Sequence, residues 1–98
     1  MQYRSRTDII AAMLRVANKG ATKTRMMYGA YLSSAQLKEY VEFLVTRNLI
    51  RRDEATSLYW LTEQGMQFLR ASAELDELSV VDGETAKREV EIVEMQRP

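Results

Sequence analysis

The sequence of 98 residues contains no cysteine and no histidine. Without these side chains a disulfide, a Cys/His zinc site, a Ser-His triad and a cysteine nucleophile are all excluded. Its four glycines, Gly20, Gly29, Gly65 and Gly83, do not form a glycine-rich phosphate loop. No carboxylate pair of a recognisable catalytic kind is present either. We therefore predict that the protein is not an enzyme and uses neither a metal nor a cofactor.

Long hydrophobic runs are also missing. The longest, IIAAML at 9–14, has six residues and is far shorter than a membrane span. The content of 46% hydrophobic and 29% charged residues is typical of a globular protein, and the length is enough for one domain. Since cysteine is absent as well, we expect a cytoplasmic protein without membrane contact.

Charge is abundant but unevenly distributed. The 14 Lys/Arg and 14 Asp/Glu residues give zero formal net charge. Residues 1–70 carry 11 basic and 6 acidic residues, whereas residues 71–98 carry 3 and 8. This split indicates a basic binding body with an acidic appendage. Two solvated surfaces would show the same split, so charge alone does not decide the function.

Two helices and a turn are predicted in the first third of the chain. Thr7 is expected to cap the first helix and Gly20 to end it in a left-handed conformation. Thr22 can cap a short second helix whose buried side is MMY at 26–28. In the turn GAYL that follows, Gly29 is free to adopt backbone angles that other residues resist.

A longer helix is predicted over residues 34–47. It begins with S-x-x-Q at Ser33, a capping-box sequence. At 100° per residue, its apolar side chains gather on an inner side and its polar side chains on an outer side, with Phe43 beside the latter. The inner side consists of Leu37, Tyr40, Val41, Leu44 and Val45. The outer side, where we expect a partner, consists of Ala35, Glu39, Glu42 and Thr46.

Two short strands, LIRR at 49–52 and SLYWL at 57–61, form a predicted hairpin after Asn48, which ends the preceding helix. Thr62 then caps a fourth helix, in whose first turn Gly65 permits close approach. Three helices, a hairpin and a further helix predict a winged helix-turn-helix. The fold class is mainly α with a small β-hairpin (α+β), and an additional helix follows at the C-terminal end.

The segment after residue 70 is predicted to be an acidic helical extension, separate from a domain over 1–70. VVDG at 80–83 is poor helix material, whereas Glu84–Arg88 and Lys87–Glu91 are pairs that support a helix. We expect a helix that is interrupted or kinked near Asp82–Gly83; a strand over VEIVEM at 90–95 is the alternative. The apolar candidates for a dimer interface are Phe68, Leu75, Leu78, Val90 and Val93.

Five segments carry a resemblance to a known family. They are RTDIIAAML at 6–14, KTRMMYGAYLS at 23–33, QLKEYVEFL at 36–44, NLI at 48–50 and YWLTEQG at 59–65. The chain resembles, over roughly 6–70, the small archaeal winged-helix proteins that include dimeric, chromatin-associated DNA-binding proteins of crenarchaea. The resemblance implies binding of double-stranded DNA by a recognition helix in the major groove and a wing on the backbone. It also implies a homodimer that pairs through the C-terminal helix.

Candidate DNA ligands follow from this fold. The recognition helix is about 34–47 and the wing about 51–58. Basic residues at the places where a winged helix meets the DNA backbone are Lys23, Arg25, Lys38, Arg51 and Arg52. The candidates for contact with bases are Ser34, Ala35, Gln36 and Glu39, since Gln can pair with adenine and Glu can accept from cytosine N4.

The alternative interpretation is a winged-helix module for protein–protein interaction that does not bind DNA. Trp60 alternates with Tyr59 and Leu61 in the second strand and is expected to face outward, and Phe43 lies beside the polar side of its helix. Aromatic residues of this kind often anchor interfaces. Their acidic neighbours Glu39 and Glu42 would then face a protein partner.

Overall fold

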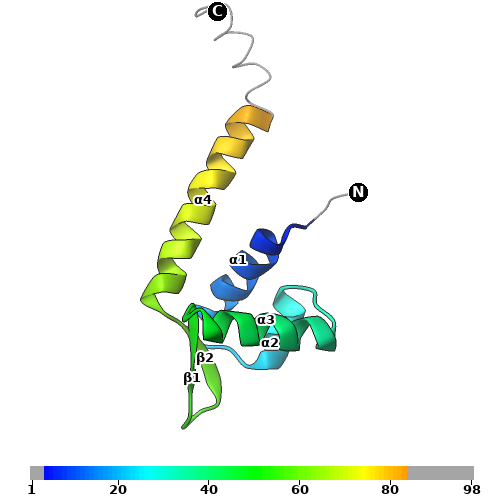
Figure 1. The fold of residues 1–98 in the computed structure, drawn as a ribbon, viewed down its shortest axis with the longest axis vertical. Coiled ribbons are helices and arrows are strands. Elements are labelled where there is room, and N and C mark those ends of the chain that lie inside the picture. Colours follow the sequence, from blue (N-terminus) through cyan, green and yellow to red (C-terminus); the bar gives the residue numbers. More distant parts are fainter. Residues whose placement is uncertain (1–3, 84–98) are drawn as a thin grey trace, which may run out of the picture.

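The computed structural model describes residues 4–83, with side chains through residue 75. Figure 1 shows a long last helix that extends from a body formed by the other helices and a hairpin. The elements are α1 (Arg6–Ala17), α2 (Lys23–Gly29), α3 (Ser34–Thr46), β1 (Ile50–Asp53), β2 (Leu58–Leu61) and α4 (Glu63–Gly83). This order confirms the predicted α+β winged-helix fold.

The starts of α2 and α3 are set by the predicted caps. Thr22 Oγ1 accepts the backbone N–H of Arg25 at 3.1 Å. At α3, the N–H of Gln36 donates to Ser33 Oγ at 3.2 Å, and the N–H of Ser33 donates to Gln36 Oε1 at 3.0 Å. Each bond satisfies an N–H group that has no partner within its own helix.

The start of α1 differs from the prediction. Ser5, rather than Thr7, is the N-cap. The reason is Asp8, which stands three residues after Ser5 and completes a capping box: its N–H donates to Ser5 Oγ, and its carboxylate accepts the N–H of Ser5. Thr7 lies inside the first turn of the helix.

The turn between α2 and α3 also differs from the prediction. Gly29 is the last residue of α2, and a Cβ at this position would lie 2.7 Å from Val16 Cγ2 of α1. Gly29 therefore permits close packing of two helices and does not supply the unusual backbone angle. That angle occurs at Tyr31, with φ of 55°. A left-handed conformation is uncommon for a tyrosine, whereas Asn tolerates it.

The core lies where α1, α2, α3 and the hairpin meet. Its largest fully buried side chains are Met13, Leu14, Met26, Leu44 and Ile50. On α3, Tyr40, Val41 and Leu44 are buried as predicted, and Leu37 is half-buried. Two predictions of burial are wrong: Tyr28 is 69% exposed and Val45 is 44% exposed. Val45 lies at the edge of the apolar side of α3, whereas Tyr28 is two positions from the buried Met26 and points to the opposite side of α2.

The hairpin is antiparallel, and Arg51 pairs with Trp60 in its register. A third segment joins it, because Ala21 and Tyr59 exchange two backbone hydrogen bonds of 2.9 and 2.8 Å. Trp60 is half-buried over the loop after α1, where a Cβ on Gly20 would lie 2.6 Å from its Cζ2 atom. Gly20 has φ of +79°, so the predicted left-handed glycine after α1 is confirmed.

The start of α4 is fastened to the segment between α3 and β1. Thr62 caps the helix as predicted and donates its hydroxyl to the carbonyl of Asn48, which itself has φ of 61°. A Cβ on Gly65 would lie 2.3 Å from the carbonyl oxygen of Leu49. The close approach predicted at Gly65 is therefore confirmed, and the start of α4 is held against the segment that follows α3.

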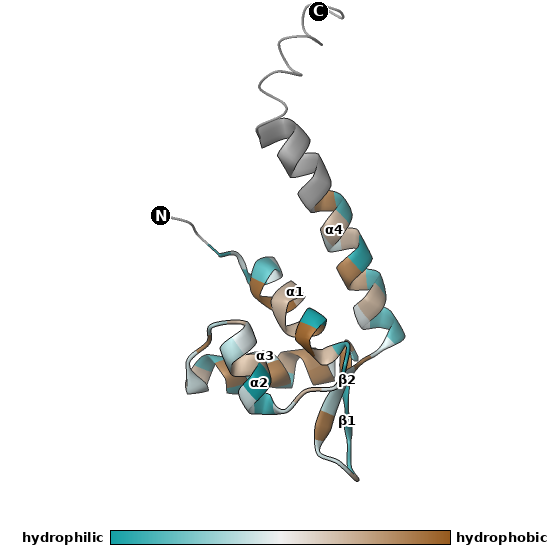
Figure 2. Cartoon of the chain, turned by 180° about the vertical axis from the view of Figure 1, so that it is seen from behind, coloured by the Kyte–Doolittle hydropathy of each residue, from teal (hydrophilic) through white to brown (hydrophobic). Residues whose placement is uncertain are grey.

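The rest of α4 runs without a break across the predicted domain boundary at residue 70 and through residues 80–83. The predicted irregularity near Asp82–Gly83 falls at the last described residues, and the alternative strand at 90–95 lies outside them. Figure 2 shows mixed hydrophilic and hydrophobic residues along the coloured part of this helix. None of the helices described over 4–83 is long and apolar enough to cross a membrane.

Candidate nucleic-acid interface

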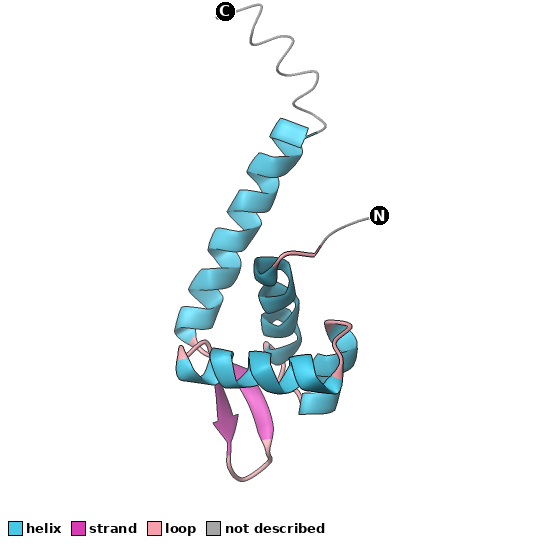
Figure 3. Ribbon diagram, turned by 45° about the vertical axis from the view of Figure 1, so that its right-hand side comes forward, coloured by secondary structure: helices cyan, strands magenta, loops and turns pink. Residues whose placement is uncertain are grey.

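The outer side of α3 is exposed to solvent as predicted. Figure 3 shows α3 lying across the front of the body, with α1 behind it and the hairpin below it. Ala35, Glu39, Glu42 and Thr46 are all exposed. No charged residue of this outer side is basic, so a polyanion that approaches it must find its cations at the two edges of the helix.

The first edge of α3 faces α2 and gathers two predicted backbone ligands. Lys23, the first residue of α2, and Lys38 of α3 line one hollow of about 310 Å³. Glu42, Val41, Val45 and Thr46 complete its lining. Glu42 is therefore not an isolated acid on the outer side, since it shares this hollow with two lysines. Arg25, also on α2, is exposed.

The second edge of α3 faces α1 and carries two cations that the sequence interpretation missed. Arg6 of α1 and Arg47, the C-cap of α3, place their guanidinium carbons 5.4 and 4.9 Å from the centre of the Phe43 ring. Arg6 is also 5.3 Å from the centre of the Tyr40 ring. No sequence signal joins residues 6 and 47, because only the packing of α1 on α3 brings them together. With Glu39, Glu42 and Thr46, these residues line an open hollow of about 420 Å³.

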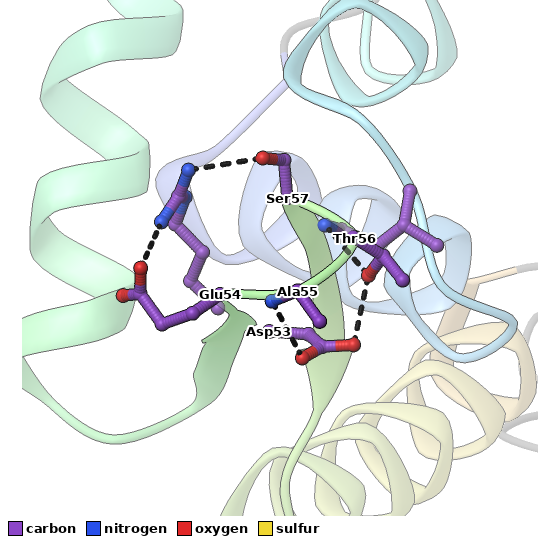
Figure 4. Close-up of polar contacts among 7 residues, drawn as sticks. Asp53, Glu54, Ala55, Thr56 and Ser57 are labelled. Carbon is purple, nitrogen blue, oxygen red and sulfur yellow. Dashed lines mark hydrogen bonds and ion pairs between the residues drawn. The ribbon is translucent and has the colours of Figure 1, made fainter.

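The wing is organised by its own acidic residues, as Figure 4 shows. Asp53 accepts the N–H of Ala55 at 3.2 Å and the hydroxyl of Thr56 at 2.8 Å. Its backbone carbonyl accepts the N–H of Ser57 at 2.7 Å, and Ser57 has φ of 62°. Asp53 is half-buried and shapes the turn, so it is a structural residue of the wing.

The two arginines of β1 differ in whether an acidic side chain pairs with them. Arg52 is paired with Glu54 at 3.1 Å and donates to Ser57 Oγ at 3.1 Å. Among the side chains of residues 4–75 this is the only ion pair, so Arg51 is exposed without an acidic partner in that part of the chain. Within residues 4–75 the charge of Arg51 is therefore uncompensated, whereas the charge of Arg52 is partly neutralised by Glu54.

The four candidates for base contact all lie on exposed positions of α3. Ser34 and Ala35 stand in its first turn. The Oε1 atom of Gln36 is engaged by the N–H of Ser33, which leaves the amide NH₂ group to donate. Glu39 lies further along and lines the hollow on the α1 side.

The aromatic residues behave differently from the protein-interaction prediction. Phe43 and Trp60 are half-buried, and their rings pack against arginines and against Gly20, respectively. The exposed aromatics are instead Tyr28 and Tyr31, at 69% and 81%. Arg4 lies 5.9 Å from the centre of the Tyr31 ring and donates to the carbonyls of Ala30 and Tyr31, which fastens the turn to the segment before α1.

The candidates for a dimer interface are only partly described. Phe68 is half-buried and packs against the core of its own chain. Leu75 is 59% exposed on α4 and is not among the residues that form the core or pack against it. The side chains of Leu78, Val90 and Val93 lie outside the described residues.

Comparisons with known proteins agree with this architecture. An uncharacterized protein of Methanocaldococcus jannaschii is 30% identical over 76 residues, which is 76% of each chain. The crystal structure of Sso10a-2, a DNA-binding protein from Sulfolobus solfataricus, matches with a TM-score of 0.72 and 22% identity, over 92% of this chain and 96% of that one. The winged helix-turn-helix family matches residues 3–80. This chain therefore belongs to the winged helix-turn-helix family, and the resemblance to archaeal winged-helix proteins is confirmed.

Proposed function

We propose that this protein binds double-stranded DNA as a homodimer, and that it serves in the cytoplasm as a transcriptional regulator or a nucleoid-associated protein. In this proposal the recognition helix, 34–47, enters the major groove and the wing, 51–58, follows the backbone. Membership of the winged helix-turn-helix family supports it, as does the fold shared with Sso10a-2, a DNA-binding protein. Catalysis forms no part of this function.

The observation that carries the proposal is the position of Lys23 and Lys38. They come from different helices and line one hollow at the edge of the exposed side of α3. A winged helix that inserts its third helix into the major groove places such residues at the rim of the groove, where phosphates lie. Arg51 adds an uncompensated charge on the hairpin, and Arg25 and Arg52 are further backbone candidates.

The acidic side chains on α3 are compatible with groove entry. Glu39 can accept from cytosine N4, and the Gln36 amide can donate to a base acceptor. Ser34 and Ala35 sit in the first turn of the helix, where the groove floor is approached most closely. Since only a few groups can read bases, we expect backbone contacts to provide most of the affinity and sequence preference to be modest.

A salt titration tests DNA binding. If two protomers each neutralise about three phosphates, log affinity falls against log salt with a slope of roughly −5. Random duplex DNA should be bound at low salt in a gel-shift assay, and Arg51→Ala with Arg52→Ala should weaken that binding. Absence of binding at low salt, or an unchanged affinity in the double variant, would contradict the proposal.

The homodimer is tested separately through α4. Leu75 is exposed, so Leu75→Glu should leave the fold of the protomer intact and break an interface that includes this position. Sedimentation equilibrium should show a dimer for the unchanged chain and a monomer for the variant. If the unchanged chain is already a monomer, α4 is not a dimerisation element.

The second candidate, a protein-interaction module, is favoured by one observation. Tyr28, near the end of α2, and Tyr31, in the turn that follows, are both exposed, and large exposed aromatic residues often mark binding surfaces. Tyr28→Ser with Tyr31→Asn separates the two functions. If these residues bind another partner or serve only the fold, the DNA affinity of this double variant should stay within about twofold of that of the unchanged chain.

A further inference from the structure

Arg6, Phe43 and Arg47 form a cluster that packing of the core does not explain. Both arginines are exposed, yet both guanidinium groups are held over the same half-buried ring, at 5.4 and 4.9 Å from its centre. Two cations gathered on one ring repel each other in the free protein. A ligand of opposite charge would relieve that repulsion.

Glu39 and Glu42 form no ion pair with these arginines. The only ion pair among the side chains of residues 4–75 joins Arg52 and Glu54. Glu39 and Glu42 line the same hollow of about 420 Å³, on the part formed by the outer side of α3. The hollow is therefore divided into an acidic part towards the middle of the outer side and a basic part towards α1.

Stacking on an aromatic ring prepares a guanidinium group for an anion. A planar guanidinium that lies over a ring keeps its N–H groups in its own plane, so they remain able to donate. The ring also restricts the rotation of a long side chain, which lowers the entropy lost when an anion is bound. Bidentate N–H donation to phosphate oxygens is a geometry that Arg provides and Lys does not.

The position of the cluster on α3 indicates which anion it meets. At 100° per residue, Lys38 and Arg47 point in directions about 180° apart around the helix axis. The acidic and small residues of the outer side lie in the arc between them. A helix is about 10–12 Å across and the major groove about 12 Å wide, so the two edges of an inserted helix reach the phosphates of opposite strands.

We propose that Arg6 and Arg47, stacked on Phe43, bind phosphate diesters of the DNA strand opposite to the strand held by Lys23 and Lys38. This proposal rests on the proposed function, and it adds two backbone ligands per protomer that no sequence motif marks. The recognition helix is then held at both edges, while Glu39 faces the amino groups of the bases between them. Counting about five phosphates per protomer, a dimer has a salt slope of roughly −9.

The test is the salt dependence of binding to a random duplex, measured by fluorescence anisotropy with the full chain. Arg6→Gln with Arg47→Gln should weaken binding at least tenfold at 50 mM salt and make the slope less steep by about 3 to 4, because four charges are lost per dimer. The matched control is Arg15→Gln with Arg70→Gln, which removes the same charge from exposed positions on α1 and α4. It should leave the slope within about 1 of the unchanged chain.

The Phe43→Leu variant tests the role of the ring. It keeps an apolar side chain and both charges, so affinity should fall a few-fold while the slope stays unchanged. The proposal is overturned if the Arg6 and Arg47 variant binds DNA with the unchanged slope, or if the control pair weakens binding equally. The proposed function itself fails on a different result, namely no binding of the unchanged chain to DNA at low salt.

Discussion

The inner and outer sides of α3, a helix of 13 residues, differ in burial and in charge. The inner side buries Tyr40, Val41 and Leu44 against α1, α2 and the hairpin. The outer side exposes Glu39 and Glu42 between two basic edges. The residues of the inner side can be identified from their spacing within the helix alone. The role of the outer side depends instead on the residues that other elements place beside it.

This difference separates stability from binding. A buried side chain loses contacts on all sides when it is truncated, and the free energy of unfolding falls accordingly. An exposed charge makes few contacts with its own chain, so its replacement changes the interaction with a charged partner far more than the fold. Substitutions on the two sides of α3 should therefore affect two different measurements.

The largest effect on stability is expected on the inner side. Leu44 is fully buried, so Leu44→Ala should lower the free energy of unfolding by about 2–5 kcal/mol in a urea titration. The matched control on the same helix is the exposed Thr46, whose replacement by Ala should change stability by less than about 0.5 kcal/mol. A similar loss for both variants would show that the two sides are not distinct.

The largest effect on binding is expected at the edge that faces α2. Lys23→Glu with Lys38→Glu should weaken binding to duplex DNA by at least about 100-fold at 50 mM salt, because four favourable contacts per dimer become repulsive. Circular dichroism should show an unchanged melting curve, since both side chains are exposed. Arg15→Glu with Arg70→Glu has the same change in net charge and should weaken binding far less. Equal losses would mean that only the total charge matters.

The inner side of α3 and the order of elements could be predicted from the sequence, because they depend on local rules. Capping at Ser33, close approach at Gly65 and the hairpin between Asn48 and Thr62 each follow from a few adjacent residues. The errors also have local reasons. Ser5, rather than Thr7, caps α1 because the acidic residue that completes a capping box stands three positions after Ser5.

The surroundings of the outer side of α3 were less predictable, because the residues that meet there are distant in the sequence. The stacking of Arg6 and Arg47 on one ring depends on how α1 crosses α3, which no short motif encodes. The wing shows the same limit. Only the structure shows that Asp53 forms the turn and that Glu54 pairs with Arg52.

A smaller effect should distinguish the acids on the outer side of α3. Glu42 shares a hollow with Lys23 and Lys38 and lies towards the rim, so Glu42→Gln should raise affinity for a random duplex by about three- to tenfold. Glu39→Gln should instead reduce the preference for sites that contain cytosine, measured by competition between duplexes. A loss of affinity for every duplex in both variants would contradict this distinction.

The smallest effect is expected at the wing, where the contrast between structural and exposed acids recurs. Glu54→Gln removes a surface ion pair worth about 0–1 kcal/mol and releases the charge of Arg52, so DNA affinity should rise by about twofold. Asp53→Ala removes two hydrogen bonds from the turn and should lower stability by about 1–2 kcal/mol. A thermal melt measures the stability of both variants, and an anisotropy titration measures their affinity for DNA. A loss of stability in Glu54→Gln together with a rise in affinity in Asp53→Ala would contradict the geometry of the wing.

The most direct test of the central claim is a map of the residues that meet DNA. Backbone amide chemical shifts of the labelled full chain should be measured during addition of a short random duplex. We predict that the largest changes occur over the recognition helix, 34–47, and around Lys23, Arg6 and Arg51, with little change over 66–75 of α4. Changes confined to α4, or to the turn that carries Tyr28 and Tyr31, would contradict the claim that the outer side of α3 and its two basic edges form the DNA-binding surface.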